Sequence, residues 1–414
     1  MTTMADNKEN RIPKFSIERE QSQTCLNSAE REKIKGSKNL NVPHLRFPEF
    51  SGEWEKCSIQ DYGEVVTGNT PPTSHTEYYE NGSYLWASPA DLGINKNITE
   101  TKTKLSLSGF KKTRSIPKGS VLVTCIGSTI GKMGMAAETM SSNQQINSIV
   151  VNDKSNSDFV YYAICRAFPR YLSEVAVQAV PILSKSNFEK LPNYTTCRDE
   201  QDKIGYFLNL LDERIATQNK VIEDLKLLRD AISKQLFYTR NNWSTFKVSD
   251  IAEIGRGRVI SAKEIAMQSN PLYPVYSSQT SNNGVMGFLD DYAFDGEYIT
   301  WTTDGANAGT VFYRNGKFNC TNVCGILKLR SEYDTYFCSL VLGLATRKYV
   351  SINLANPKLM NNTMASITIG IPSLTEQKRI SNLFRGLDNE LSRNETLVRL
   401  YNLVKTFLLQ QLFI

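Results

Sequence analysis

The chain contains an internal repeat, and a repeat constrains the possible folds more strongly than any other feature of a sequence. Glu200-Gln201 recurs as Glu376-Gln377, 176 residues later. The correspondence then continues without a gap to the end of the chain, where Gln235-Leu236-Phe237 matches Gln411-Leu412-Phe413. The sequence therefore predicts an architecture in which each structural unit occurs twice.

The regions that precede these segments also resemble each other. Trp54 and Trp243 begin similar stretches, in which Gly68 matches Gly257 at an offset of 189. A chain of 414 residues with 40% hydrophobic residues can form several ordinary domains. We predict an α+β fold with two tandem globular domains separated by two long helices. The predicted boundaries are a polar, loosely ordered N-terminal tail and lead-in at 1–53, a first domain at 54–199, a central helix at 200–242, a second domain at 243–375 and a C-terminal helix at 376–414.

The two predicted helices share one heptad pattern, which is typical of a coiled coil. Polar residues interrupt the apolar spacing at equivalent places, with Gln218 and Arg229 in the first helix and Asn394 and Lys405 in the second. Matched interruptions favour an antiparallel pair over two helices that pack separately on their own domains. The predicted seam consists of Leu211, Ile215, Gln218, Ile222, Leu225, Arg229, Ile232, Leu391, Asn394, Val398, Tyr401, Lys405 and Leu408.

The pattern also predicts a register for the pair. We expect Gln218 opposite Lys405 and Arg229 opposite Asn394, because every apolar layer then meets another apolar layer. A shift by one heptad would bury Gln218 against Val398 and leave polar groups without partners, at about 1–3 kcal/mol each. A rigid helix pair in this register would hold the two domains at a fixed spacing.

Charge and composition narrow the environment of the chain. A net charge of +6 and a pI near 8.7 suit a polyanionic partner without proving one. No apolar run approaches the ~18 residues of a membrane span, and the N-terminus lacks the apolar core of a signal peptide. We therefore expect a cytoplasmic protein with reduced cysteines. Only Cys320 and Cys324 lie close together, far from either histidine, so we expect no metal site.

Both globular domains offer groups that could contact DNA. Lysines and one arginine between Lys102 and Lys118 could neutralise phosphates, although a solvated loop is the alternative. Arg can contact guanine through two hydrogen bonds, and Asn or Gln can contact adenine in the same way. Any one polar loop residue can equally be a turn or cap residue. The candidates are Gly68, Asn69, Thr70, Lys102, Lys104, Lys111, Lys112, Arg114, Ser128, Thr129, Lys132, Asn143, Gln144, Gln145, Arg256, Arg258, Ser278, Gln279, Thr280, Asn282, Asn283, Thr303, Asn307, Asn319 and Asn322.

Motifs of catalysis are missing from the sequence. Asn69-Thr-Pro-Pro-Thr73 only approaches an amino-methyltransferase motif, and Gly127–Met133 is one residue short of a phosphate-binding loop. No Pro-Asp dipeptide begins a nuclease site, and two histidines, His44 and His75, leave little for acid–base chemistry. These absences favour a binding subunit over an enzyme.

Together these features resemble the specificity subunit of type I restriction–modification systems. The residues that carry the resemblance are the Asn41–Phe50 lead-in with Trp54, the paired Glu-Gln starts at 200 and 376, Ile371-Pro372, and the Gln-Leu-Phe ends at 237 and 413. The resemblance implies a non-catalytic chain that recognises two short half-sites in double-stranded DNA. It implies that two modification (methyltransferase) subunits dock on the helices and that restriction (motor-nuclease) subunits join them. It also implies that S-adenosylmethionine, ATP and Mg serve the partners and that this chain binds no cofactor.

Two alternatives remain open at this stage. The chain could be a fused methyltransferase or nuclease with a diverged catalytic site, in which case it would turn over DNA on its own. It could also be a coiled-coil scaffold without DNA specificity, in which case its binding would be indifferent to salt and to base sequence.

Overall fold

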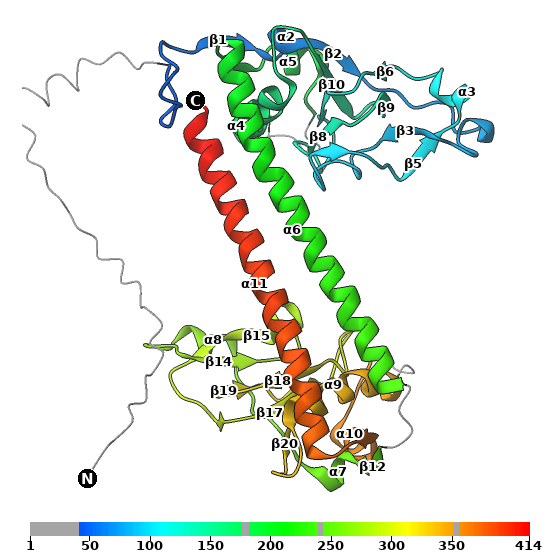
Figure 1. Ribbon diagram of the computed structural model, residues 1–414, viewed down its shortest axis with the longest axis vertical. Helices are drawn as coiled ribbons and strands as arrows, with labels where there is room; N and C mark the ends of the chain where they lie inside the picture. Colours follow the sequence, from blue (N-terminus) through cyan, green and yellow to red (C-terminus); the bar gives the residue numbers. More distant parts are fainter. Residues whose placement is uncertain (1–40, 176–181, 239–242, 352–355) are drawn as a thin grey trace, which may run out of the picture. The chain divides into compact units, whose positions relative to one another are not determined.

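The computed structural model describes residues 41–175, 182–238, 243–351 and 356–414 (Figure 1). The chain divides into two compact units: unit 1 is Met1–Phe207 with Phe407–Ile414, and unit 2 is Leu208–Thr406. Residues 1–40 of the predicted N-terminal tail and lead-in, which extends to residue 53, lie outside the described residues. In the described ranges no helix is both long enough and apolar enough to cross a bilayer.

Unit 1 contains the first globular domain, which is α+β as expected. A five-stranded sheet has the order β2-β10-β7-β8-β4, a four-stranded sheet has the order β5-β3-β9-β6, and β1 pairs with β11. The strands are β1 (Glu55–Ser58), β2 (Gly63–Thr67), β3 (Tyr84–Ala87), β4 (Asn97–Ile98), β5 (Thr103–Leu105), β6 (Ser115–Ile116), β7 (Val121–Thr124), β8 (Met133–Ala136), β9 (Met140–Ser142), β10 (Ile146–Val151) and β11 (Pro192–Thr195). The helices are α2 (Ile59–Tyr62), α3 (Leu107–Phe110), α4 (Ser157–Val175) and α5 (Lys185–Glu189), with a 3-10 turn at Thr76–Tyr78.

Unit 2 contains the second globular domain, which repeats this plan. Its sheets have the orders β13-β20-β17-β18 and β15-β14-β19-β16, and β12 pairs with β21. The strands are β12 (Ser244–Lys247), β13 (Ala252–Arg256), β14 (Tyr273–Tyr276), β15 (Val285–Leu289), β16 (Phe294–Asp295), β17 (Tyr298–Thr302), β18 (Val311–Arg314), β19 (Lys317–Cys320), β20 (Cys324–Leu329) and β21 (Thr368–Ile371). The helices are α7 (Val248–Ile251), α8 (Ala262–Ala266), α9 (Thr335–Ala345) and α10 (Asn361–Ser366), with 3-10 turns at Ser281–Gly284 and Thr346–Tyr349.

A central tryptophan shows how the strands of unit 2 form a core. Trp301 lies on β17, a strand of β-branched and aromatic residues, and its side chain is completely buried. The indole N–H of Trp301 donates to the Leu359 carbonyl at 3.0 Å. A Cβ on Gly325 of the neighbouring strand β20 would lie only 2.2 Å from the Trp301 ring. Glycine at this position therefore lets the indole pack flat against the strand.

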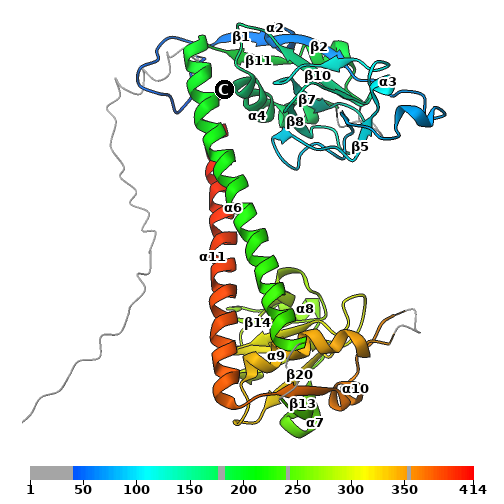
Figure 2. The ribbon, with the colours of Figure 1, turned by 45° about the vertical axis from the view of Figure 1, so that its right-hand side comes forward.

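The two long helices, α6 (Arg198–Tyr238) and α11 (Leu374–Leu412), have the predicted seam. Figure 2 shows them side by side, as does Figure 1. Between Glu213 and Ala231 all side chains of α6 are exposed except five, and these five are the seam residues Ile215, Gln218, Ile222, Leu225 and Arg229. The apolar face of the helix is thus as narrow as a heptad pattern requires.

The antiparallel direction of the helices is confirmed in unit 2, but the predicted register is wrong. Gln218 donates to the side-chain oxygen of Asn394, not to a group beside Lys405. Arg229 forms an ion pair with Asp388 through Nε and Oδ1 at 2.7 Å. These contacts correspond to the register that is shifted by one heptad from the expected one.

The length of the seam cations explains why their charges find partners in the register that is shifted by one heptad. Lys405 pairs with Asp212 at 2.6 Å, and Asp212 occupies in α6 the place that Asp388 occupies in α11. The two aspartates flank the seam, so each long cation of the seam reaches a carboxylate one position away from the facing layer. The predicted register compared only residues that face each other directly. It therefore gave the shifted register a cost for buried polar groups, which these ion pairs offset.

An aromatic cluster joins each globular domain to the end of a helix. In unit 1 the Trp54 ring lies 5.6 Å from Phe159 of α4 and 5.9 Å from Phe413. In unit 2 the Trp243 ring lies 5.5 Å from Phe337 of α9 and 5.9 Å from Phe237. The repeated Gln-Leu-Phe motif thus has a structural role, because its Phe completes the aromatic cluster in both units.

Candidate DNA interface

Three loops meet at one end of the sheets in the first domain. The Asn69 backbone N–H donates to the Ser142 carbonyl at 2.9 Å, and the Cys125 N–H donates to the Gln145 carbonyl at 2.8 Å. The Thr70 hydroxyl also donates to Gln144 Oε1 at 2.5 Å. The candidate residues at 68–70, at 127–132 and at 143–145 therefore belong to one cluster of loops, although they are far apart in the sequence.

Asn69 has its side chain engaged within this cluster. Its amide donates to the Lys112 carbonyl at 2.9 Å and accepts from the Arg114 N–H at 2.8 Å. The Arg114 guanidinium in turn donates to the Thr67 carbonyl at 2.8 Å. Asn69 thus positions the basic segment beside the loops and has little capacity left for a base.

The basic segment itself is solvent-exposed. Lys102, Lys111, Lys112, Arg114 and Lys118 are exposed, whereas Lys104 is partly covered and pairs with Glu100 at 2.8 Å. Because both members of this pair lie near water, the pairing is worth little and can exchange for a phosphate.

Equivalent loops of the second domain surround a cavity of about 440 Å³. Five candidates take part in the lining or lie beside it on the same loop: Ser278, Gln279, Thr280, Asn307 and Asn322. Thr303 and Asn319 do not face it, because both are buried and bond to backbone carbonyls, those of Val323 at 2.9 Å and Asp291 at 2.7 Å. The lining also includes Ile260, Ser277, Met286, Asp304, Gly305, Ala306, Thr321 and Val323.

Both candidate arginines of the second domain already form hydrogen bonds with other side chains. Arg256 donates from Nε to Asn361 at 2.9 Å. Arg258 contacts both carboxylate oxygens of Glu264, at 2.5 and 3.1 Å. The hydrogen bond to Glu264 raises the pKa of Arg258, and the same bond lowers the pKa of the Glu264 carboxyl. Arg258 can reach a guanine only if it leaves this exposed ion pair.

The loop that carries Asn282 and Asn283 has an unusual backbone. Both residues have positive φ, 49° and 52°, and Gly284 follows with φ of 79°. Asn and Gly tolerate this left-handed region better than other residues, which explains the composition of the loop. Asn283 lines a second cavity of about 710 Å³, beside Arg229 and Tyr313. It therefore lines a different cavity from Gln279, which lines the first.

Sequence inspection missed one buried cation beneath these loops. The Arg314 guanidinium stacks over the Tyr276 ring at 3.6 Å and donates to the Thr300 hydroxyl at 3.1 Å. Burial lowers the pKa of Arg314, and within the described ranges it has no carboxylate partner. A lone Arg in a strand gives no sequence signal of burial, because arginine is ordinarily a surface residue.

The two domains build these loops on the same backbone frame. The Gly68 N–H donates to the Ile146 carbonyl at 3.1 Å, and the Gly257 N–H donates to the Cys324 carbonyl at 3.3 Å. A Cβ at Gly68 or Gly257 would lie 2.2 or 1.9 Å from a carbonyl oxygen, so only glycine fits either position. The residues at the loop tips differ, however: Asn69 corresponds to Arg258, Thr129 to Asn307 and Gln144 to Asn322.

The chemistry of these loops is that of hydrogen bonding. The tips carry amides, hydroxyls and cations. Over the ranges that the structure describes, no three His, Cys, Asp or Glu side chains gather in a way that could hold a metal ion. Such groups can donate to or accept from base edges and phosphates.

Comparison with known proteins identifies the family. A family model described as the type I restriction modification DNA specificity domain matches residues 51–227 and 240–400. The chain belongs to the type I specificity subunits. It is therefore a non-catalytic subunit of a type I restriction–modification enzyme, with DNA target recognition as its role.

Relatives with similar sequences occur in Mycoplasma pneumoniae. A putative type I specificity subunit is 48% identical over 141 residues, 34% of this chain and 74% of that protein. The specificity subunit of the type I restriction enzyme MpnII is 42% identical over 170 residues, 40% of this chain and 51% of the relative. The chain thus spans about half the length of the MpnII specificity subunit and about three quarters of the other relative.

A solved structure has the same fold. The type I restriction–modification S subunit from M. genitalium superposes with a TM-score of 0.66 at 17% sequence identity, covering 90% of this chain and 99% of that one. At this identity the likeness concerns the arrangement of the elements and not the residues at the loop tips.

Proposed function

We propose that the two globular domains recognise the two halves of a bipartite target in double-stranded DNA, each through its three-loop cluster. The observation that supports this is the shared backbone frame with different tips, since Thr129 and Gln144 of the first domain correspond to Asn307 and Asn322 of the second. One frame with two sets of hydrogen-bonding groups suits two different base sequences. The exposed lysines beside the first cluster add contacts with phosphate that do not depend on sequence.

Methylation mapping tests this function. We expect the complex of this chain with its modification subunits to methylate genomic DNA at sites that share two short half-sites with an unspecified gap. Replacing residues 54–199 by the same segment of a relative is expected to change one half-site and leave the other unaltered. Methylation without sequence preference, or a change in both halves at once, would contradict the proposal.

The partner subunits belong to the same proposal. We infer that two modification subunits dock on the helix pair and that restriction (motor-nuclease) subunits join this complex in the cytoplasm. S-adenosylmethionine, ATP and Mg then serve the partners. Exposed apolar residues on the helices support the docking: Leu227 is 62% exposed and Leu403, its equivalent in the repeat, is 67% exposed. Leu228 and Val404 are exposed beside them. Two equivalent apolar patches suit two copies of one partner.

Charged substitutions in these patches test the docking. We expect Leu227→Glu to remove one of the two modification subunits and Leu227→Glu with Leu403→Glu to remove both, because a carboxylate would be desolvated in an apolar interface. Size-exclusion chromatography with light scattering measures the stoichiometry. Leu272→Glu is the matched control, since Leu272 is 60% exposed in unit 2 but lies outside the long helices. Unchanged stoichiometry in the double variant would exclude these patches as docking sites.

A further inference from the structure

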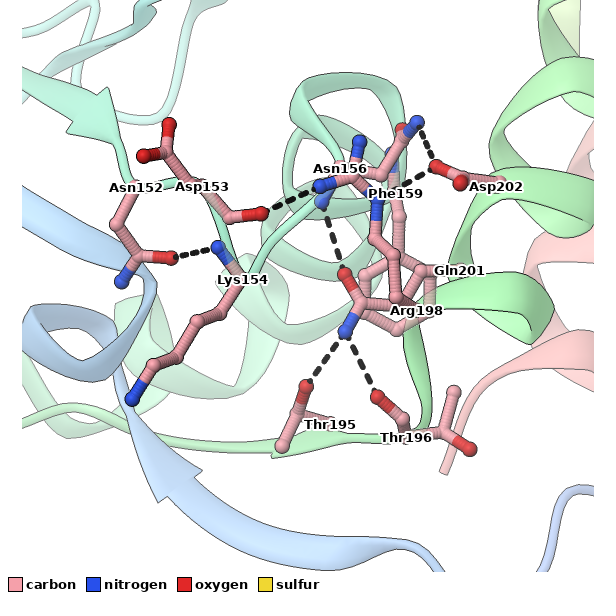
Figure 3. Close-up of polar contacts among 10 residues, drawn as sticks. All are labelled: Asn152, Asp153, Lys154, Asn156, Phe159, Thr195, Thr196, Arg198, Gln201 and Asp202. Carbon is pink, nitrogen blue, oxygen red and sulfur yellow. Dashed lines mark hydrogen bonds and ion pairs between the residues drawn. The ribbon is translucent and has the colours of Figure 1, made fainter.

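The start of each long helix is fastened to its globular domain by a buried glutamine. In unit 1, Gln201 of α6 accepts from the Asn156 backbone N–H at 2.9 Å through Oε1 (Figure 3). Its Nε2 donates to the Thr196 carbonyl at 2.7 Å and to the Thr195 hydroxyl at 3.2 Å. A single amide thus ties the beginning of α6 to the residue that precedes α4 and to the end of β11.

Unit 2 repeats this fastening with Gln377 of α11. Gln377 Oε1 accepts from the Asp334 N–H at 2.9 Å, and its Nε2 donates to the Pro372 carbonyl at 2.9 Å. Gln201 and Gln377 are each only 2% exposed. The repeated Glu-Gln motif of the sequence therefore marks two equivalent domain–helix junctions.

The residue whose backbone N–H each glutamine accepts, Asn156 or Asp334, is also the N-cap of the helix that follows it. Asn156 Oδ1 accepts from the Phe159 N–H at 2.9 Å at the start of α4. Asp334 Oδ1 accepts from the Phe337 N–H at 2.8 Å at the start of α9. Asn and Asp are equally good N-caps, so capping alone does not explain why one junction has an amide and the other a carboxylate.

The residues of the long helix that lie beside the N-cap explain why it is Asn in the first junction and Asp in the second. Asn156 Nδ2 donates to Asp202 Oδ1 of α6 at 2.7 Å (Figure 3). A Cβ on Gly205, one turn further along α6, would lie 2.7 Å from Asn156 Oδ1. An amide can donate to the Asp202 carboxylate, whereas a second carboxylate in its place has no proton to offer.

The second junction has the opposite polarity. The repeat places Lys378 of α11 where α6 has Asp202, and Ser381 where α6 has Gly205. The Ser381 hydroxyl donates to Asp334 Oδ1 at 2.5 Å. This junction therefore supplies a hydroxyl donor to a carboxylate N-cap, and it has a lysine at the position of Asp202.

We propose that these contacts make the junctions selective, so that the first domain can pack at the start of either long helix but the second domain is excluded from the start of α6. On α6 the Asp334 carboxylate would face Asp202 without a donor from the position of Gly205. On α11 the Asn156 amide would still accept from Ser381. Like charges at hydrogen-bonding distance in a partly buried site are unfavourable. Asn156 and Asp334 are thus positioning residues that select the helix start against which each domain packs.

Single substitutions in the full-length chain test the selectivity. Asn156→Asp is expected to lower the melting temperature of unit 1 by about 4 °C. Adding Asp202→Lys, which copies the polarity of the second junction, is expected to restore most of the loss. Asp334→Asn is the matched control and should shift the melting temperature of unit 2 by less than about 2 °C, because an amide oxygen still accepts from Ser381 and Phe337.

A domain transfer gives the decisive comparison. In one chimaera residues 243–373 replace residues 54–197 in front of α6. We expect this protein to melt several degrees below the same chimaera that carries Asp334→Asn, although the substitution is nearly neutral in the natural chain. Arg198 contacts Asp202 through Nε at 2.8 Å. If this one cation neutralised the carboxylates of both Asp202 and Asp334, the two chimaeras would melt at the same temperature. Equal melting temperatures for the two chimaeras, or no loss in Asn156→Asp, would overturn the proposal while leaving DNA recognition untouched.

Discussion

Phe384→Ala is expected to destabilise unit 2 more than any other single substitution on the long helices, by about 3–5 kcal/mol in the free energy of unfolding. Phe384 is fully buried on α11 and packs in the core that contains Ile232 and Phe237 of α6. Its ring lies 6.0 Å from the Phe237 ring, and the Arg229 guanidinium lies 5.6 Å above it. The ring therefore joins both helices to the second domain, and its removal leaves a cavity among three elements.

Chemical denaturation monitored by tryptophan fluorescence measures this loss, since Trp243 and Trp301 belong to the same unit. Leu383→Ala is the matched control, because Leu383 is the neighbouring residue of α11 and is 47% exposed. We expect the control to cost less than about 1 kcal/mol. Similar losses for both variants would show that the helix pair does not depend on this core.

The sequence predicted the helices and their seam because these depend on local periodicity. Apolar residues at heptad spacing define one face of a helix whatever it packs against. The register of the pair was predicted wrongly because it depends on how far side chains reach across the seam. Arg229 and Lys405 extend to Asp388 and Asp212, and no pairing of facing positions includes those contacts.

The candidate interface was predictable in its loops but not in its individual residues. Gly, Asn, Ser and Thr mark turns, and turns at the same end of a sheet come together. Whether a polar residue points outward depends on strand pairing, which places Asn319 inside, against the Asp291 carbonyl. The ion pair between Arg258 and Glu264 could not be predicted either, because Glu264 lies on the short helix α8, which carries no candidate DNA-binding residue.

Two amides in the second domain remain available for base recognition. Asn307 and Asn322 are exposed and line the cavity of about 440 Å³. Over the ranges that the structure describes, neither side-chain amide has a hydrogen-bonding partner. An asparagine in this state can form two hydrogen bonds with adenine without first breaking a protein contact.

Asn322→Ala is therefore expected to weaken binding to the cognate duplex by roughly 5- to 150-fold, the equivalent of about 1–3 kcal/mol, and Asn307→Ala by a similar factor. Competition binding of the assembled complex to duplexes with every base changed in turn measures the effect. Each variant should relax the preference at one position of one half-site and leave the other half-site unchanged. Asn270→Ala, an exposed Asn of the same domain outside the cavity, should bind like the natural chain.

The form of the loss separates base recognition from contact with the backbone of DNA. Substitution of Lys111 in the first domain removes an exposed cation, so it should weaken binding to every duplex alike and make the dependence of log K on log salt shallower by about one unit. Asn322→Ala should leave that slope unchanged, because an amide releases no counterion. A uniform loss on all sequences in Asn322→Ala, or a changed salt slope, would mean that this cavity contacts phosphate and that the bases of the second half-site are recognised elsewhere.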